Sequence, residues 1–123
     1  MRTHKDLFAW KNSIELVQEV YQITKTFPKE ELFCLTMQLR RAAISVPSNI
    51  AEGAARNQKR EFIRFLRIST GSLTEVETQL TIAWKLKYLP ETEFLTHTGR
   101  INKIRAQIAG LIKNLEQKLG PRR

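Results

Sequence analysis

A proline inside a helical pattern, Pro47, constrains the fold of this 123-residue chain more than any other feature. Before it, apolar residues recur at spacings of three and four, and Ile50 and Ala54 continue the same face after it. The pattern therefore predicts one helix that runs through the proline. A proline in a helix interior removes one backbone hydrogen bond and crowds the carbonyl four residues earlier, at a cost of about 3 kcal/mol. We therefore expect a kink near Ala43.

A line of polar side chains runs beside this apolar face at helical spacing, formed by Gln38, Arg41, Ser45, Asn49 and Glu52. Two interpretations are open. The line is either an ordinary solvated stripe or a buried polar network that holds the kinked helix in register against a partner helix or subunit. The second interpretation extends the network to the third helix, through Ser72, Glu75 and Gln79. In that case Glu52 and Glu75 should tolerate substitution less well than Glu91 and Glu93, which lie at an exposed helix start.

The rest of the chain is predicted to form helices that are separated at Pro28 and Pro90, with Asn57 as the cap of the third helix. The expected helices are roughly 6–27, 30–55, 58–88 and 91–119, within a single domain, 1–123. The third has the most regular apolar seam, with four-three spacing through Phe62, Leu66, Ser69, Leu73, Val76, Leu80 and Ala83. Short links favour antiparallel neighbours. We therefore predict an all-α, up-down-up-down four-helix bundle.

Two small residues suggest specific packing. Gly71 lies inside the third helix, where glycine costs about 1 kcal/mol relative to alanine, and this predicts a close contact with another helix. Cys34, the single cysteine, lies beside Leu35 in an apolar segment, and we expect it to fill space in the core.

The charge of the chain is strongly positive and unevenly distributed. The net charge is +9, and residues 40–67 hold seven basic and two acidic groups, whereas residues 1–39 are balanced. Residues 97–123 hold seven basic groups and one acidic group. Such a balance favours polyanionic partners. Because there is no apolar run of about 18 residues and no signal-peptide pattern, we expect a cytoplasmic protein without a membrane partner.

A stripe of basic residues is the best candidate site. Arg56, Arg60, Arg64 and Arg67 are spaced so that they share one side of the third helix, with Lys59 beside them. Arginine donates bidentate hydrogen bonds to phosphate. A solvated helix face is the alternative, but such faces mix both signs, and here Glu61 stands almost alone.

A second basic patch is predicted on the fourth helix. It consists of Arg100, Lys103, Arg105, Lys113 and Lys118, followed by the terminal Arg122 and Arg123. Aromatic side chains are not expected among either set of basic residues. Contacts to phosphate without base readout are therefore the expectation.

Catalytic and metal-binding motifs are not recognisable. A di-metal bundle needs Glu-x-x-His pairs, whereas Glu93 and His97 are spaced by four. The serines and Cys34 lack an accompanying histidine, and no phosphate-cradling or dinucleotide-binding glycine motif is present. We expect neither an enzyme nor a cofactor.

The segment around the proline also resembles a known family. Ser45-Val-Pro-Ser-Asn-Ile-Ala-Glu-Gly53, with Gln38-Leu-Arg-Arg-Ala-Ala43 before it and Phe62-Ile-Arg-Phe-Leu66 and Gly71-Ser-Leu-Thr-Glu75 after it, resembles the bacterial 23S rRNA intervening-sequence proteins. The resemblance implies a four-helix bundle that forms a homopentamer. Some members are encoded inside insertions in large-subunit rRNA genes, and related proteins are accessory subunits of the reverse transcriptases of diversity-generating retroelements.

Charge and resemblance together lead to two functional hypotheses. The first is a ring-like homo-oligomer that binds RNA or DNA mainly through phosphates, as an accessory subunit of a retroelement reverse transcriptase. The second is a protein-binding scaffold encoded with an rRNA intervening sequence, whose basic faces meet an acidic partner and which has no direct nucleic-acid role.

Overall fold

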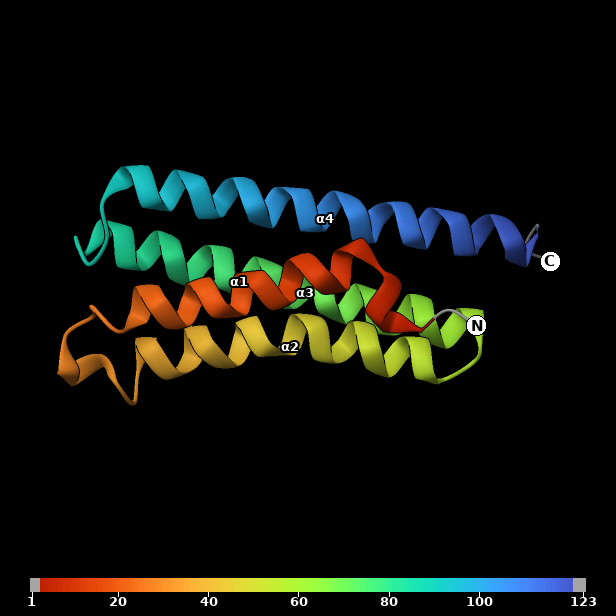
Figure 1. Ribbon diagram of the computed structural model, residues 1–123, viewed down its shortest axis with the longest axis horizontal. Helices are drawn as coiled ribbons and strands as arrows, with labels where there is room; N and C mark the ends of the chain where they lie inside the picture. Colours follow the sequence, from red (N-terminus) through yellow and green to blue (C-terminus); the bar gives the residue numbers. More distant parts are fainter. Residues whose placement is uncertain (1–2, 121–123) are drawn as a thin grey trace.

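Four long helices, packed side by side and alternating in direction, make up the chain (Figure 1). The computed structural model describes residues 3–120. The helices are α1 (Phe8–Thr24), α2 (Leu35–Ala55), α3 (Lys59–Lys85) and α4 (Glu91–Leu119). Two short 3-10 helices, η1 (His4–Asp6) and η2 (Lys29–Glu31), precede α1 and α2. The predicted all-α antiparallel bundle is confirmed.

Four helix boundaries differ from the predicted ones by two residues or more, and one of them is the end of α1, which lies at Thr24 rather than at residue 27. Asp6 accepts the Thr3 amide at 3.0 Å in a capping box of η1, so α1 begins only at Phe8. The second helix starts at residue 35 because residues 29–31 form a 3-10 turn. The third helix ends at residue 85, shortly before Lys87, which adopts a φ of 66°. Helix α4 has the predicted bounds.

The core is formed by the apolar seams of all four helices. The predicted α3 seam is confirmed: Phe62 packs against the core, and the buried members are Leu66, Ser69, Leu73, Val76, Leu80 and Ala83. In α4 the buried apolar residues are Ile101, Ile104 and Ile108, whereas Leu115 is only partly buried. Because α1 has 17 residues and α4 has 29, α1 does not cover the last turns of α4 (Figure 1).

Helix α2 continues through Pro47, as the periodicity predicts, and polar bonds to α3 accompany the proline. The Ser69 hydroxyl donates to the carbonyl of Val46 at 2.9 Å. The Ser72 hydroxyl donates to the Ser45 hydroxyl at 2.9 Å, and the Asn49 amide donates to the carbonyl of Ser45 at 2.8 Å. The two serine bonds join α2 and α3 at the level of the proline, whereas the Asn49 bond lies within α2.

The predicted buried polar network forms only in part within the chain. Ser72 is buried, and Asn49 and Gln79 are partly buried, but the other members are exposed: Gln38, Arg41, Glu52 and Glu75. Glu52 pairs with Arg56, one turn later, rather than with Arg41. The exposed members lie on the sides of α2 and α3 that no other helix covers, so within one chain the solvated interpretation holds for them.

Two packing expectations are wrong. Gly71 is exposed, and a Cβ atom there would meet nothing within 4 Å. The glycine at a close helix contact is Gly53, where a Cβ would lie 2.7 Å from the Cβ of Phe65. Cys34 is exposed because it lies in the connection between η2 and α2, outside the core. In the described part of the chain, no helix is long and apolar enough to cross a membrane.

Candidate nucleic-acid interface

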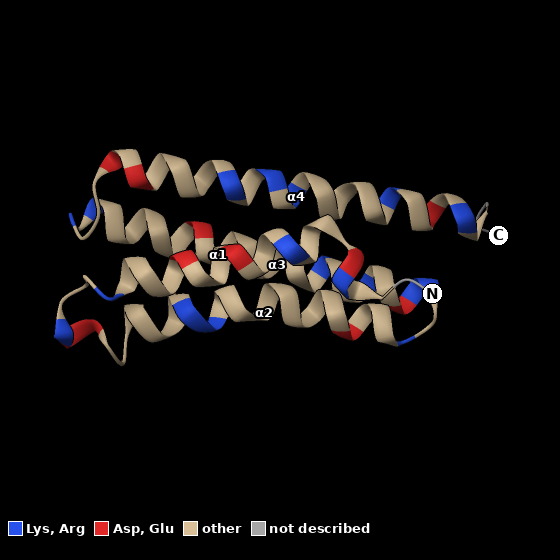
Figure 2. Cartoon of the chain, viewed as in Figure 1, with Lys and Arg blue, Asp and Glu red and all other residues tan. Residues whose placement is uncertain are grey.

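Basic side chains gather at the end of the bundle where α2 ends, α3 begins and α4 ends (Figure 2). We call this region, residues 52–67 and 111–119, the basic end. Its basic groups are Arg56, Lys59, Arg60, Arg64, Arg67, Lys113 and Lys118. Its acidic groups are Glu52, Glu61 and Glu116, so seven positive charges face three negative ones and the net charge is +4. All seven basic residues are exposed.

The two predicted basic patches are not one surface. The predicted stripe and Lys113 belong to the basic end, but Arg56 is the C-cap of α2 and not part of α3. One shallow cavity of about 460 Å³ is lined by Arg67, Arg105 and Lys113 together. Arg100 instead contacts α1, where it pairs with Glu15 and Glu19. Lys103 is exposed on α4, away from the basic end. Arg122 and Arg123 lie outside the described residues.

Most arginines of the stripe are held by carboxylates. A guanidinium nitrogen of Arg56 lies 2.8 Å from Glu52, and one of Arg64 lies 2.9 Å from Glu61. The hydrogen bond from Arg64 is the main cause that lowers the pKa of Glu61 and raises that of Arg64. These are exposed pairs, which stabilise a fold weakly and exchange partners readily.

The expectation that the stripe has almost no acidic partners is therefore wrong. Arg67 pairs with Glu116 of α4 at 3.2 Å, and Arg105 pairs with Glu77 of α3 at 3.0 Å. These partners lie far away in the sequence, so spacing along one helix could not reveal them. By contrast, neither Lys59 nor Arg60 forms an ion pair within residues 3–120.

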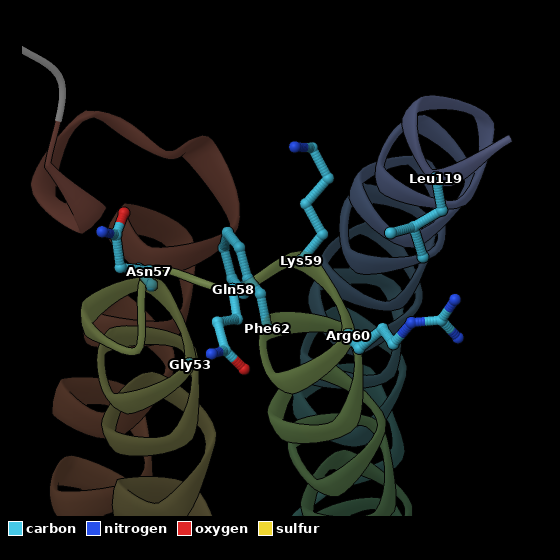
Figure 3. Close-up of a pocket in the computed structure, with 8 residues that line it drawn as sticks. Gly53, Asn57, Gln58, Lys59, Arg60, Phe62 and Leu119 are labelled. Atoms are coloured by element: carbon cyan, nitrogen blue, oxygen red, sulfur yellow. The ribbon is translucent and has the colours of Figure 1, made fainter.

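Aromatic side chains also lie among the basic residues, contrary to the expectation from the sequence. The guanidinium carbon of Arg56 lies 5.2 Å from the centroid of the Phe65 ring, and the guanidinium carbon of Arg64 lies 4.5 Å from it. Phe62 lines a recess of about 530 Å³ (Figure 3), together with Gly53, Ala54, Asn57, Gln58, Lys59, Arg60 and Leu119. Both phenylalanines stand between arginines in the sequence, but the seam pattern assigned Phe62 to the core alone.

A second recess, of about 470 Å³, lies next to the first. Both recesses are lined by Arg60 and Leu119. The second adds Ile63, Arg64 and Arg67 from α3 and Glu116 and Gly120 from the end of α4. The basic end is therefore hollowed, with apolar and cationic side chains around the same space.

The first recess lies beside the turn between α2 and α3. Asn57 adopts a left-handed conformation, with a φ of 58°, and Gln58 is extended. The residue expected to cap α3 was Asn57, but the N-cap is Gln58, whose side chain makes no capping bond. The first turn of α3, which contains Lys59 and Arg60, therefore starts at the rim of the recess. The helix dipole of α3 has its positive end at this turn.

A cluster that the sequence did not reveal joins α4 to α1. His97 is buried, with Nδ1 3.5 Å from Glu19; Arg100 forms an ion pair with Glu19 at 2.8 Å and donates a hydrogen bond to Glu15 at 2.9 Å. The spacing of Glu15 and Glu19 on α1 and of His97 and Arg100 on α4 is the signal that could have found it. Within residues 3–120, no group of three or more His, Cys, Asp or Glu side chains could hold a metal ion.

Comparison with known proteins assigns the chain to a family. Residues 5–110 match the family model described as 23S rRNA-intervening sequence protein. The chain belongs to this family. The family match includes the predicted stripe but ends before Lys113 and Lys118, so those two α4 residues of the basic end lie outside the matched region.

A solved structure shows the same fold. The crystal structure of a protein of unknown function from the S23 ribosomal protein family of Bacteroides thetaiotaomicron aligns with a TM-score of 0.79, over 85% of this chain and 98% of that one. The two sequences are 20% identical, so the similarity shows the four-helix fold alone. None of the curated proteins matches the chain.

Proposed function

We propose that this protein is a non-enzymatic, basic homo-oligomer that binds RNA or DNA mainly through phosphate contacts. The observation that carries the proposal is the net charge of +4 at one end of the bundle, where Lys59 and Arg60 have no carboxylate partner in the described residues. Cations held close together displace the counterions of a nucleic acid, and this release drives binding without sequence specificity.

The ion-paired arginines support the same function. Arg56, Arg64 and Arg67 are positioned by exposed glutamates, so their guanidinium groups are already directed along the surface. Exchanging an exposed carboxylate for a phosphate keeps the guanidinium group hydrogen-bonded and costs little, because the original pair is solvated. The surface supplies groups that bind phosphate in both RNA and DNA.

The proposal includes a ring-like homo-oligomer, five subunits being the number that the family resemblance implies. Support comes from large apolar side chains left exposed on the single chain: Phe33 at 78%, Leu86 at 51% and Ile82 at 44%. A kink at Pro47 would shape the α2 surface for such contacts. A ring repeats the basic end in each subunit, so binding gains from multivalency. A monomer mass by light scattering at micromolar concentration would contradict the oligomer.

A place beside a reverse transcriptase is the biological setting we propose, by analogy with the retroelement relatives. The second candidate function is a protein-binding scaffold, favoured by the same exposed apolar side chains, whose basic end would meet an acidic protein. A complex with a partner protein that forms without nucleic acid, together with an absence of salt-dependent RNA or DNA binding, would favour the scaffold.

The test replaces Arg60, Arg64 and Arg67 together by glutamine. Affinity falls as salt rises, and each phosphate contact that the variant loses makes the plot of log affinity against log salt concentration less steep by about 0.7 to 0.9. The matched control replaces Lys25, Lys85 and Lys87 by glutamine, which removes the same charge at the opposite end of the bundle. A triple arginine variant that stays folded and oligomeric but binds single-stranded RNA, duplex DNA and their hybrid like the parent would remove the stripe from the mechanism.

A further inference from the structure

We propose that the two recesses of the basic end form one groove for single-stranded nucleic acid, in which an unpaired base lies against Phe62. The inference rests on the proposed function and names the class of nucleic acid that its site takes. The two recesses are neighbours, because Arg60 and Leu119 line both.

The groove combines apolar and cationic surface. Phe62 is partly buried, and Ile63 is 8% exposed; with Leu119 they supply apolar surface inside the two recesses. Lys59 and Arg60 are exposed at the first recess, and Arg64 and Arg67 line the second. Binding of phosphates alone would require only the cationic side chains and would not account for the apolar surface inside the recesses.

Contact with unpaired bases would account for the apolar surface inside the recesses. In a duplex the faces of the bases are stacked on each other and only the phosphates and groove edges reach a protein, whereas a single strand can turn a base into a recess and stack it on an aromatic ring. The first recess, of about 530 Å³, lies within the range of about 300 to 1,000 Å³ that is common for small-molecule pockets. It therefore has room for a nucleobase.

The side chains around Phe62 fit a base without selecting one. Figure 3 shows the Phe62 ring and the Gln58 side chain between the ends of α2 and α3, with the Asn57 side chain directed away from the ring, Lys59 extending outward and Arg60 directed toward α4. An amide both donates and accepts hydrogen bonds, so Gln58 offers partners to the edge of any base. Lys59 and Arg60 line the same recess and can bind the phosphates next to that base.

Gly53 determines how closely α2 packs against the Phe62 ring. A Cβ at this position would lie 3.1 Å from Cδ1 of Phe62 and 2.7 Å from the Cβ of Phe65, so the absence of a side chain lets α2 approach α3 closely. The Phe62 ring is thereby supported by α2 on one side while it lines the recess. Preorganisation of this kind reduces the entropy lost when a base binds.

The test compares three fluorescent probes by anisotropy: an oligouridylate of about 12 nucleotides, the same backbone with abasic units in place of the bases, and a duplex of equal length. We expect the parent protein to bind the oligouridylate about 5 to 100 times more tightly than the abasic strand, since each stacked base contributes on this scale. Phe62→Leu should remove most of that difference and leave the affinity for the abasic strand and the duplex unchanged.

Phe33→Leu is the matched control, because it removes an exposed aromatic ring at the opposite end of the bundle. Circular dichroism and light scattering verify that both variants keep the fold and the assembly. If Phe62→Leu does not fold, the comparison of intact and abasic strands on the parent decides by itself.

Equal, salt-dependent binding of all three probes by the parent would overturn the groove while the proposed function stands. A Phe62→Leu variant that binds all probes more weakly by the same factor would also overturn it. Failure of the parent to bind any probe at low salt would contradict the proposed function itself.

Discussion

At the basic end of the bundle seven basic groups face three acidic ones, whereas at the opposite end four lysines face four glutamates (Figure 2). The opposite-end groups are Lys25, Lys29, Lys85 and Lys87 with Glu30, Glu31, Glu91 and Glu93. Both ends consist of helix termini and short connections, and both are solvated. The fold therefore does not require an excess of one sign, and the repulsion at the basic end points to a partner that neutralises it.

The exposed apolar side chains have the opposite distribution, because they gather at the charge-balanced end. The charge-balanced end exposes Leu32, Phe33, Leu86 and Leu95. The Tyr88 hydroxyl there donates to Glu31 at 2.8 Å, and this hydrogen bond is the main cause that raises the pKa of Tyr88. The proposed function therefore assigns nucleic acid to the basic end and protein contacts to the balanced one.

The largest expected effect comes from the unpaired cations of the basic end. Replacing Lys59 and Arg60 by glutamine should reduce the steepness of log affinity against log salt by about 1.4 to 1.8 for each engaged subunit. Replacing Lys85 and Lys87, which removes the same charge from the balanced end, should leave the slope unchanged. Equal decreases in the two variants, measured by anisotropy from low to moderate salt, would abolish the distinction between the ends.

A smaller effect, on stability, should separate two glycines. Gly53→Ala places a Cβ 2.7 Å from that of Phe65 and should lower the free energy of unfolding by about 1 to 3 kcal/mol. Gly71→Ala meets open space in α3 and should raise it by about 1 kcal/mol through helix propensity. Urea unfolding measures both. A destabilising Gly71→Ala would show that another subunit approaches α3 there.

The smallest effect is expected at the carboxylates. Glu52 is exposed in a pair with Arg56, and Glu91 is exposed at the start of α4, so alanine at either position should change the free energy of unfolding by less than about 1 kcal/mol. Melting curves of the two variants should nearly coincide. A decrease of about 3 to 5 kcal/mol for Glu52→Ala alone would indicate that a neighbouring subunit buries the polar line.

Local patterns determined the elements of this protein. The four-three seam of α3, the apolar continuity across Pro47 and the prolines at residues 28 and 90 were sufficient to predict four antiparallel helices, because helix formation and amphipathicity depend on neighbours three and four positions away. The arginine stripe followed from the same rule. The charge excess of residues 40–67 needed only counting.

Tertiary structure decided which charges are free and where the surface is hollow. Glu116 reaches Arg67 across 49 positions, and Phe62 of the seam also lines a recess that Leu119 of α4 completes. Ion pairs and recesses form between helices, so they depend on the relative rotation and length of α3 and α4, which the spacing within either helix does not contain. For this reason the sequence alone located the basic helix face, and the packing of the bundle formed recesses along part of that face.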